Sequence, residues 1–304
     1  MPVAPQKMIV VLNPASGRGT GTNNRAAIQA CLEEEAKQLP TPFQWELWQT
    51  TASGEGTQLA ERAVKEGADL VVAAGGDGTL AEVLNGTIGT SSQLGLIPCG
   101  TGNDCARTLG IALEVRSAVQ NLLQGDARPI DVGRTQGHYF LNVAGCGFDA
   151  IVAEKVKSGV RFLHGTAAYL AAIMLSMGHM HPYPIRLTLD DRTEDLRAIL
   201  CSVANTKSYG GGMLIAPDAE IDDGLFDVCI LGDTGKIEFL RAFPTVFTGK
   251  HIHHPKVRME RARYVKIESE TPLPILVDGE VIGTTPVEFQ IFPQAVKMRL
   301  PHPQ

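Results

Sequence analysis

Short hydrophobic runs alternate with segments of helical spacing up to about residue 130. The runs predict strands at residues 8–12, 43–49, 69–74 and 94–98. The segments between them predict helices at about 25–39, at 57–65 and at 80–84. Strands that alternate with helices are typical of a parallel, doubly wound sheet, so we expect an α/β domain in this part of the chain.

The pattern changes after about residue 131, where strand-like runs follow one another with few helices between them. These runs lie at 140–144, 185–189, 198–203, 226–231, 264–267, 275–277, 287–291 and 296–300. They predict a mostly antiparallel β domain with a helical insertion around 150–177. We place the two domains at 1–134 and 135–304, and the last strand is a candidate to return to the first domain.

Composition narrows the class of protein. The chain has 304 residues, and its 27 Lys and Arg against 33 Asp and Glu give a net charge of −6. This sign argues against a general nucleic-acid binder and against strong adhesion to anionic membranes, although it leaves room for a local basic patch. The apolar stretch at 166–177 is too short to span a bilayer, and the six cysteines form no C-x-x-C pair. We therefore expect a soluble, cytoplasmic protein with reduced thiols.

A glycine-rich loop, GGDGT at 75–79, lies directly between the third predicted strand and a predicted helix. Glycines let the backbone approach a ligand, and the amides that begin the helix attract an anion. Asp77, in the middle of such a loop, would repel a phosphate unless it binds a divalent cation or removes a proton nearby. The alternative is a tight strand–helix turn in which Asp77 is an N-cap.

Two further loops have the same setting. GTGND at 100–104 follows the strand at 94–98, and NPASG at 13–17 follows the first strand. Because the carboxyl ends of parallel strands face one crevice, the three loops together predict one phosphate-rich ligand. The sequence has no Walker motif and no complete G-x-G-x-x-G, which disfavours a Walker-type NTPase and a dinucleotide oxidoreductase.

The three loops, in this order, resemble the signature of the diacylglycerol kinase catalytic domain, which soluble bacterial lipid kinases share with sphingosine kinases. The resemblance continues through PIDVG at 129–133, NVAGCGFD at 142–149, residues 216–227 and VDGE at 277–280, so it covers nearly the whole chain. It implies an α/β nucleotide domain and a β-sandwich domain, with the active site between them. Similar GGDG loops occur in NAD kinases and phosphofructokinases, so the specificity lies in the combination of motifs.

The resemblance also implies chemical roles, carried over position by position. Glu280 matches the proposed acceptor of the lipid hydroxyl proton, and Asp77 matches the carboxylate that works with the catalytic Mg²⁺. Some relatives are discussed with this aspartate as the base, so the two roles stay open. The expected nucleotide contacts are Asn13, Ser16, Thr50, Gly75, Gly76, Asp77, Gly78, Thr79, Gly100, Thr101 and Asn103.

An acidic segment, PDAEIDDGLFD at 217–227, resembles a calcium loop only superficially, because its glycine falls one place late and Cys229 stands at position 12. The family resemblance implies a structural Mg²⁺ here, held by the carboxylate of Asp223 and the backbone carbonyls of Glu220 and Leu225. A plain acidic hairpin turn is the alternative. The histidines at 251, 253 and 254 lack a carboxylate or cysteine to complete a metal site, so we expect solvated loop histidines.

The predicted reaction is transfer of the γ-phosphoryl group of ATP to a lipid hydroxyl, with diacylglycerol as the expected acceptor. The expected partners are ATP, Mg²⁺ and a lipid taken up during transient visits to a membrane surface, with a homodimer possible. The stretch at 166–177 is either a lining for the lipid or a core-packed helix.

Two other functions stay open. One is NAD kinase-type phosphorylation of a ribose hydroxyl, against which the opening NPASG and the late DGE argue. The other is a non-catalytic nucleotide or lipid sensor, which would have no chemical use for Asp77, Asn103, Asp104 and Glu280 together.

Overall fold

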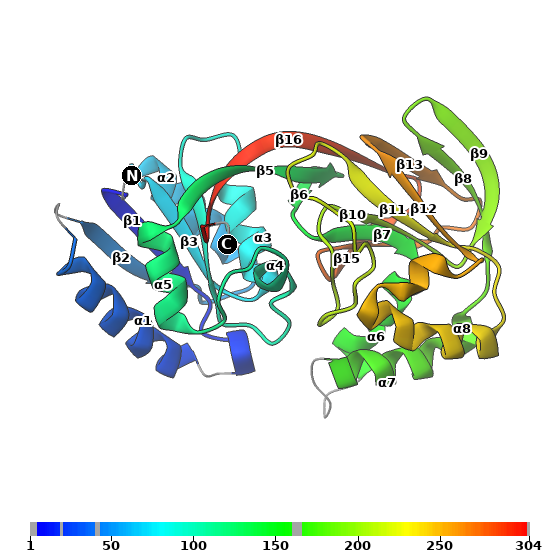
Figure 1. The fold of residues 1–304 in the computed structure, drawn as a ribbon, viewed down its shortest axis with the longest axis horizontal. Coiled ribbons are helices and arrows are strands. Elements are labelled where there is room, and N and C mark those ends of the chain that lie inside the picture. Colours follow the sequence, from blue (N-terminus) through cyan, green and yellow to red (C-terminus); the bar gives the residue numbers. More distant parts are fainter. Residues whose placement is uncertain (1–4, 19–20, 40–42, 160–165, 303–304) are drawn as a thin grey trace. The chain divides into compact units, whose positions relative to one another are not determined.

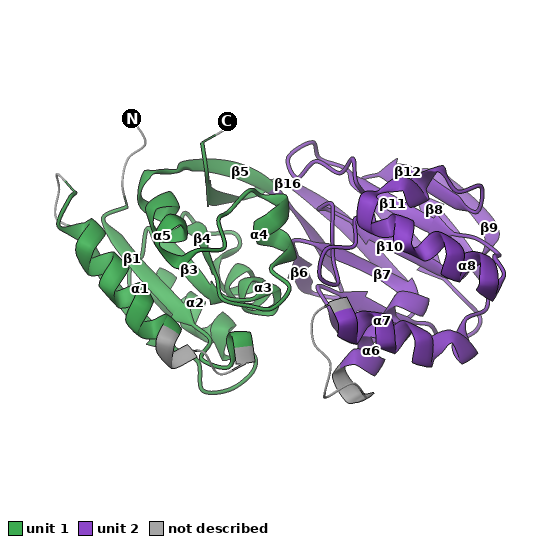
Figure 2. Ribbon diagram, turned by 60° about the horizontal axis from the view of Figure 1, so that its bottom comes forward, with its two compact units in different colours: residues 1–130, 294–304 green, residues 131–293 purple. Residues whose placement is uncertain are grey.

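The computed structural model describes residues 5–18, 21–39, 43–159 and 166–302. The chain divides into two compact units (Figure 2). Unit 1 comprises residues 1–130 and 294–304, and unit 2 comprises residues 131–293. Two strands, β5 (Asp126–Thr135) and β16 (Val287–Leu300), contribute residues to both units.

The division differs from the predicted domains in one place, because the first unit ends at residue 130 rather than 134. The last strand was a candidate to return to the first domain, and residues 294–304 do belong to unit 1. The exact boundaries were not predictable, because β5 and β16 are continuous strands with no turn there. The runs predicted as separate strands at 287–291 and 296–300 are one strand, in which Gln294 has a left-handed φ of 53°.

Unit 1 is built on a parallel sheet. The strand order is β2 (Gln44–Gln49), β1 (Lys7–Leu12), β3 (Leu70–Gly75) and β4 (Gln93–Pro98), and Met298 of β16 pairs with Leu94 of β4. One face shares a hydrophobic core with α1 (Gly21–Ala36) and α5 (Val115–Gln124). On the other face α2 (Glu55–Lys65) and α3 (Asp77–Thr87) pack together against the central strands (Figure 1). Since both faces are covered, β1 and β3 have nearly continuous hydrophobic sequences.

Unit 2 contains two packed sheets. The first is antiparallel throughout, in the order β12 (Val257–Ala262), β11 (Phe226–Leu231), β10 (Leu200–Ala204), β7 (Val143–Gly147), β14 (Pro274–Val277) and β15 (Glu280–Thr284). In the second, the strand order is β16, β13 (Tyr264–Glu268), β8 (Tyr183–Leu189) and β9 (Arg192–Ala198), all antiparallel. Strand β5 pairs with β6 (His138–Phe140).

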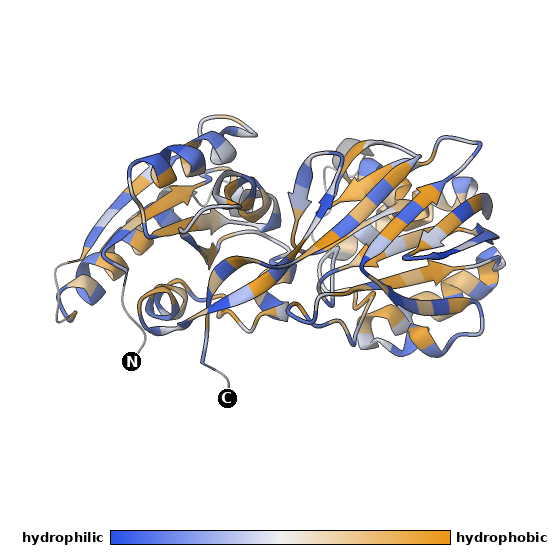
Figure 3. Ribbon diagram, turned by 90° about the horizontal axis from the view of Figure 1, so that it is seen from above, coloured by the Kyte–Doolittle hydropathy of each residue, from blue (hydrophilic) through white to orange (hydrophobic). Residues whose placement is uncertain are grey.

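Side chains from both sheets fill a common core in unit 2. Phe140 lies against Phe226 of the first sheet and Phe289 of the second, with ring centroids 5.7 and 6.2 Å apart. Hydrophobic and hydrophilic residues alternate along some strands of unit 2 (Figure 3), such as β8, which has one face on this core. Strands β7, β10 and β11 are buried throughout, because helices cover their other face. The predicted fold class, an α/β domain and an antiparallel β-sandwich, is confirmed.

Helices cover the end of the sandwich near β10 and β11 (Figure 1). The predicted insertion at 150–177 consists of α6 (Phe148–Gly159), α7 (Thr166–Ser176) and the 3₁₀ turn η2 (Met177–His179); residues 160–165 lie outside the described residues. A second helical region was not predicted: α8 (Lys236–Ala242), η3 (Phe243–Thr248) and η4 (Lys250–His253). These pieces are too short to give a helical periodicity. In the described part of the chain, no helix has the length and hydrophobicity needed to cross a bilayer.

Candidate functional site

The carboxyl ends of the parallel strands lie side by side in unit 1. The N–H of Asn13, the first residue after β1, donates to the carbonyl oxygen of Ala74 in β3 (3.0 Å). The N–H of Cys99, after β4, donates to the oxygen of Gly75 (2.8 Å), and that of Thr50, after β2, to the oxygen of Leu12 (3.0 Å). The sheet therefore brings the loops at 13–17, 75–79 and 100–104 to one edge.

The side chain of Asn13 links the first loop to the second. Its Nδ2 donates to the hydroxyl oxygen of Thr79 (3.1 Å), and its Oδ1 accepts from the N–H of Ala15 (3.0 Å). The N–H of Ser16, which begins the 3₁₀ turn η1 (Ser16–Arg18), donates to the carbonyl oxygen of Asn13 (3.1 Å). Asn13 thus orders both loops, so this asparagine has a structural role whether or not it also contacts a ligand.

Glycines 76 and 100 let the second and third loops touch. A Cβ on Gly100 would lie 2.5 Å from the Cα of Gly76, closer than real Cβ atoms approach other backbone atoms. A Cβ on Gly75 would likewise collide with the side chain of Thr79. The third loop is closed by Asn103, which has a φ of 53° and exchanges two side-chain hydrogen bonds with the backbone of Gly100 (3.0 and 2.9 Å). Thr101, at the tip, is exposed.

Gly78 differs from these glycines because nothing in the described structure requires it. It is exposed, lies in the first turn of α3, and a Cβ there would have no neighbour within 4 Å. A glycine without an internal reason is consistent with a ligand that needs the backbone bare, such as a phosphate at a helix N-terminus.

We expect Gly78→Ala to raise the KM for ATP about tenfold or more while the melting temperature stays equal or rises. Alanine in a helix is about 0.5–1 kcal/mol more favourable than glycine, so the fold does not suffer. Steady-state kinetics and thermal melts measure the two effects. Gly178→Ala, another open position with no left-handed φ, is the matched control. An unchanged KM for ATP in Gly78→Ala would contradict a phosphate contact at this loop.

Asp77 caps a helix, though not the one that it begins. Its carboxylate accepts the N–H groups of Asp104 (3.1 Å) and Cys105 (3.0 Å), the first residues of α4 (Asp104–Thr108). The N-cap of its own helix, α3, is Gly76, which makes no side-chain bond. The alternative considered for the sequence, in which Asp77 is the N-cap of the helix that follows its strand, is therefore wrong, because the carboxylate caps α4 instead.

The capping bonds bring a second carboxylate into the site. The position of a Cβ on Gly102 lies 3.4 Å from Oδ2 of both Asp77 and Asp104. Asp104 was not among the predicted contacts, although its place in GTGND was the available signal. Two carboxylates suit a Mg²⁺ ion whose remaining ligands are nucleotide phosphates and water. An all-protein cage does not form, since no group of three or more His, Cys, Asp or Glu converges among the described residues.

Glu280 lies in unit 2, on the β14–β15 hairpin. Val277 pairs with Glu280, and the two residues between them, Asp278 and Gly279, have φ values of 45° and 89°. Two consecutive left-handed residues define the type I′ turn, for which Asp-Gly is a preferred sequence. The hairpin tip is anchored because the carboxylate of Asp278 accepts the N–H groups of residues 141, 142 and 143 (3.0, 2.9 and 3.3 Å). The exposed Glu280 therefore projects from a fixed position.

The acidic segment at 217–227 is tied down by protein groups. Asp131 accepts the N–H of Gly224 through its carboxylate (2.6 Å) and donates its own N–H to Ile221 (2.7 Å). The carboxylate of Asp223, the predicted Mg²⁺ ligand, forms an ion pair with Arg261 and accepts the N–H of Leu225 (3.0 Å). A cation bound at Asp223 would have to compete with this arginine.

Asp227 is a second candidate for a cation in this segment. Its side chain is buried, and its Oδ2 has no hydrogen-bond partner, although the Nε of the same Arg261 lies 3.8 Å away. Burial, together with the negative charges of Asp218 and Glu220, raises the pKa of Asp227 to about 6. A divalent cation would relieve both the repulsion and the unsatisfied oxygen. The donors here are thus compatible with a metal ion, although Glu220, Asp223 and Leu225 stay a prediction as its ligands.

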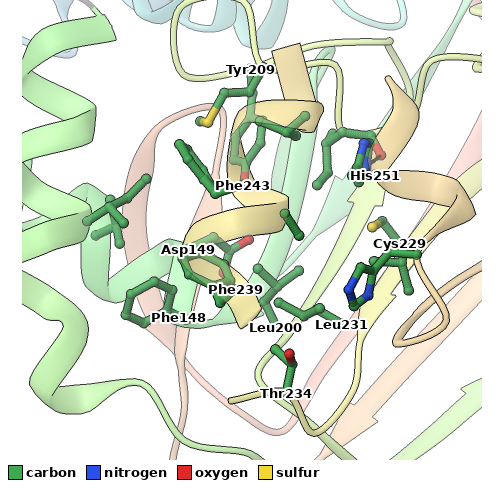
Figure 4. Close-up of a pocket in the computed structure, with 18 of the residues that line it drawn as sticks. Phe148, Asp149, Leu200, Tyr209, Cys229, Leu231, Thr234, Phe239, Phe243 and His251 are labelled. Atoms are coloured by element: carbon green, nitrogen blue, oxygen red, sulfur yellow. Dashed lines mark hydrogen bonds between the residues drawn. The ribbon is translucent and has the colours of Figure 1, made fainter. Parts of the chain in front are cut away.

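A hydrophobic pocket of about 90 Å³ lies within unit 2 (Figure 4). Its walls come from all the covering helices and from β10 and β11: Phe148, Val152, Tyr169, Ile173, Leu200, Leu231, Phe239 and Phe243 are among the lining residues. The inner face of α7 lines the pocket and belongs to a packed core, as the second interpretation of residues 166–177 predicts. A role in lining a bound lipid stays a prediction. The lining is apolar, and a volume of about 90 Å³ is enough for a few methylene groups.

Polar groups stand at one side of this pocket. The carboxylate of Asp149, in the first turn of α6, accepts the hydroxyl hydrogen of Ser202 (3.0 Å) and the N–H of Ala150 (2.9 Å). Ser202 also makes a side-chain hydrogen bond with Tyr209, whose pKa is raised by burial and by the charge of Asp149. Burial raises the pKa of Asp149 to about 6, because these hydrogen bonds only partly offset desolvation. No sequence pattern indicated this group, because its three residues come from separate segments of the chain.

The pKa of Asp149 predicts a pH-dependent stability. Since the folded pKa, about 6, lies above the ordinary value of 3.8, the folded state holds its proton more tightly, and its stability falls as pH rises from about 4 to 6. Asp149→Asn removes the charge, so we expect it to stabilise the protein by up to about 3 kcal/mol at pH 8 relative to pH 4. Denaturant unfolding at the two pH values measures this difference. The same stability difference between variant and wild type at both pH values would contradict it.

The histidines of the 250–254 region do not behave alike. His253 is exposed, as predicted, but His251 is buried, with Nε2 3.2 Å from the carbonyl oxygen of Ile215. Burial lowers the pKa of His251. The expectation of solvated histidines is therefore wrong for His251, because η4 turns this side chain into the pocket.

Two family models match this chain. Residues 7–135 match the diacylglycerol kinase catalytic domain, and residues 142–300 match the YegS C-terminal NAD kinase beta sandwich-like domain. The chain is 34% identical to the diacylglycerol kinase of Bacillus subtilis (strain 168) over 92% of this chain and 91% of that protein. It is 32% identical to the diacylglycerol kinase of Mycobacterium tuberculosis (strain ATCC 25618 / H37Rv), over 97% of this chain and 95% of that one.

Solved structures agree with these matches. A crystal structure from Bacillus anthracis str. Sterne has a TM-score of 0.80 at 25% identity and covers 99% of both chains. A crystal structure of a diacylglycerol kinase from the same strain, at 22% identity, has a TM-score of 0.75 over 99% of this chain and 98% of that chain, which supports the fold. The fold, the loops and the matches define a lipid kinase. The chain belongs to the diacylglycerol kinase catalytic domain family and carries that family's NAD kinase-like β-sandwich.

Proposed function

We propose that this lipid kinase transfers the γ-phosphoryl group of ATP to the free hydroxyl of diacylglycerol and thereby makes phosphatidic acid. The observation that carries the proposal is the full-length similarity to proteins named diacylglycerol kinase, at 34% and 32% identity. The acceptor is then an alcohol with two acyl chains and no charge.

The nucleotide side of the proposal rests on the loops of unit 1. The bare backbone at Gly78 and the first amides of α3 suit the phosphates of ATP. Asp77 and Asp104 would hold Mg²⁺ together with those phosphates. The ion would neutralise charge that develops on the transferring group. The protein would position the nucleotide, because Asn13, Gly76 and Gly100 hold the three loops in one arrangement.

The lipid side rests on unit 2. The pocket beneath α6, α7 and α8 offers an apolar lining of the kind that an acyl chain needs. Helix α6 connects this pocket to the hairpin of Glu280, because Phe148 and Val152 line the pocket while Ala150 and Ala153 pack on Leu276 of β14. An acyl chain in the pocket and a carboxylate on the hairpin would thus be held by one helix.

In the proposed reaction, Glu280 accepts the proton of the lipid hydroxyl. The hydroxyl oxygen forms a bond to the γ-phosphorus, the bond from that phosphorus to the bridging oxygen breaks, and ADP leaves. Asp278 acts as a positioning residue, since its three backbone hydrogen bonds fix the hairpin on which Glu280 stands.

A panel of purified acceptors tests the proposal. With ATP and Mg²⁺, we expect phosphate transfer to diacylglycerol at a rate about 10² or more above that to NAD or to no acceptor, the margin that a site built for one substrate commonly reaches. Faster transfer to NAD would replace the proposal with an NAD kinase-type reaction, which the description of the second matched domain makes the relevant alternative. ATP binding without phosphate transfer to any acceptor would favour the remaining alternative, a non-catalytic sensor.

A further inference from the structure

Exposed hydrophobic side chains are concentrated on two helices of unit 2. In the described residues, seven large hydrophobic side chains are well exposed, and five of them lie on α7 and α8. We call these five the α7–α8 face: Leu170, Met174, Leu175, Ile237 and Leu240, with 42, 57, 58, 69 and 38% of each residue accessible. Single exposed hydrophobic residues are ordinary, but these five lie on two helices that line the same pocket, so they belong to the outer side of one helical layer, and several exposed hydrophobic side chains on one such layer mark an interaction surface.

The composition of α7 makes the exposure unusual. The helix has the sequence TAAYLAAIMLS and contains no charged residue. A surface helix normally carries polar residues on its outer side, and a helix that is apolar all round is normally buried. Here Ala172 and Ile173 are buried on the inner side, whereas Met174 and Leu175 face outward. Eleven residues are too few to cross a bilayer, so the helix suits the surface of an apolar phase and not its full thickness.

The α7–α8 face covers the pocket. Tyr169 and Ile173 of α7, and Phe239 and Ala242 of α8, line the cavity from above. Phe239 also contacts Phe148 edge to face, with ring centroids 5.8 Å apart, which holds α8 on the first turn of α6. The two helices therefore separate the interior of the pocket from whatever contacts their outer side.

Basic residues border the same face, in contrast to the rest of the chain. Between residues 233 and 256 the exposed cations are Lys236, Arg241, Lys250 and Lys256. They outnumber the carboxylates Asp233 and Glu238 two to one, in a chain whose net charge is −6. His254 Nε2 lies 3.5 Å from Glu238 Oε1, which places the loop after η4 beside α8. On α6, Glu154 and Lys155 are both exposed and offset each other.

We propose that the α7–α8 face inserts into the surface of an anionic lipid bilayer, with its cations among the headgroups. Hydrophobic side chains that enter the acyl region and neighbouring Lys and Arg at the headgroups are the two contributions that hold peripheral helices on membranes. Charge complementarity favours this occupant over a second copy of the acidic chain. Docking would bring the pocket to the membrane that holds the lipid. This purpose rests on the proposed function, whereas the binding to the bilayer does not.

Vesicle sedimentation tests the proposal without relying on catalysis. The full chain is mixed with vesicles of phosphatidylcholine alone or of phosphatidylcholine with phosphatidylglycerol. We expect binding to the anionic vesicles that weakens with added salt, and about a tenfold or greater loss of affinity in the double variant Met174→Ser, Leu175→Ser. Leu113→Ser is the matched control, because Leu113 is similarly exposed, at 46%, but lies in unit 1. Thermal melts verify that each variant is folded.

Several outcomes would contradict the proposal that this face docks on a membrane. Wild-type protein that does not sediment with anionic vesicles overturns it, and so does a double variant that binds as the wild type does. A wild-type dimer that becomes a monomer in the double variant would assign the face to a second copy of the chain. Kinase activity towards a water-soluble, short-chain diacylglycerol is measured in parallel. Loss of vesicle binding with that activity intact separates failure of docking from failure of the proposed function.

Discussion

Glu280→Gln lowers the turnover of diacylglycerol by about 10²–10⁴-fold, the usual loss when a general base is removed. Glutamine has nearly the same shape as glutamate but does not accept a proton at neutral pH. Because Glu280 is exposed on an anchored hairpin, the melting temperature and the KM for ATP should not change. Steady-state kinetics with saturating ATP, together with a thermal melt, measure all three quantities.

Glu288→Gln is the control for this variant. Glu288 is also an exposed strand glutamate of unit 2, on β16, and it pairs across from Lys266 of β13. Its substitution should leave turnover intact. Near-normal turnover in folded Glu280→Gln would show that another group accepts the proton, and Asp77 would then be the first candidate.

The second large effect is expected at Asp77. Asp77→Asn removes the charge that a Mg²⁺–nucleotide complex would use, so we expect turnover to fall by about 10²–10⁴-fold and half-maximal activity to require more Mg²⁺. The change also weakens the cap on α4, at a cost of about 1 kcal/mol in the free energy of unfolding. A Mg²⁺ titration of the residual activity separates the two effects.

Asp69→Asn is the matched control for this variant, because Asp69 lies just before β3 and Asp77 lies just after it. The carboxylate of Asp69 accepts the N–H groups of Gln6 (3.0 Å) and Lys7 (2.9 Å). The carboxylate of Asp77 also accepts two backbone N–H groups, so the two side chains have similar structural roles. Asp69→Asn should lose a similar amount of stability and keep its activity. If both variants lost activity in proportion to stability, the role of Asp77 would be structural alone.

Local patterns were sufficient to predict the loops of unit 1. The strands β1, β3 and β4 are covered on both faces, so their hydrophobic runs end where the sheet ends and the polar loop begins. That is why 13–17, 75–79 and 100–104 could be placed at one edge. The Asp-Gly pair at 278–279 similarly carries its own turn geometry.

Contacts between distant segments were not predictable in this way. The cap from Asp77 to α4 joins residues 27 and 28 positions apart, and the bond from Ser202 to Asp149 spans 53. The orphaned oxygen of Asp227 and the burial of His251 depend on how loops pack. The α8–η4 region was missed because Gly235, Pro244 and Gly249 divide it into turns too short for a periodic pattern. These are tertiary effects that a single sequence does not display.

The identity of the phosphorylated product is the most direct test of the central claim. The protein is incubated with γ-labelled ATP, Mg²⁺ and a mixed extract of membrane lipids, and the labelled lipid is identified by chromatography and mass spectrometry. We expect phosphatidic acid to carry the label and the label to be absent with Glu280→Gln. Label in a different lipid would change the acceptor, and no labelled lipid from folded, ATP-binding protein would contradict the assignment as a diacylglycerol-phosphorylating enzyme.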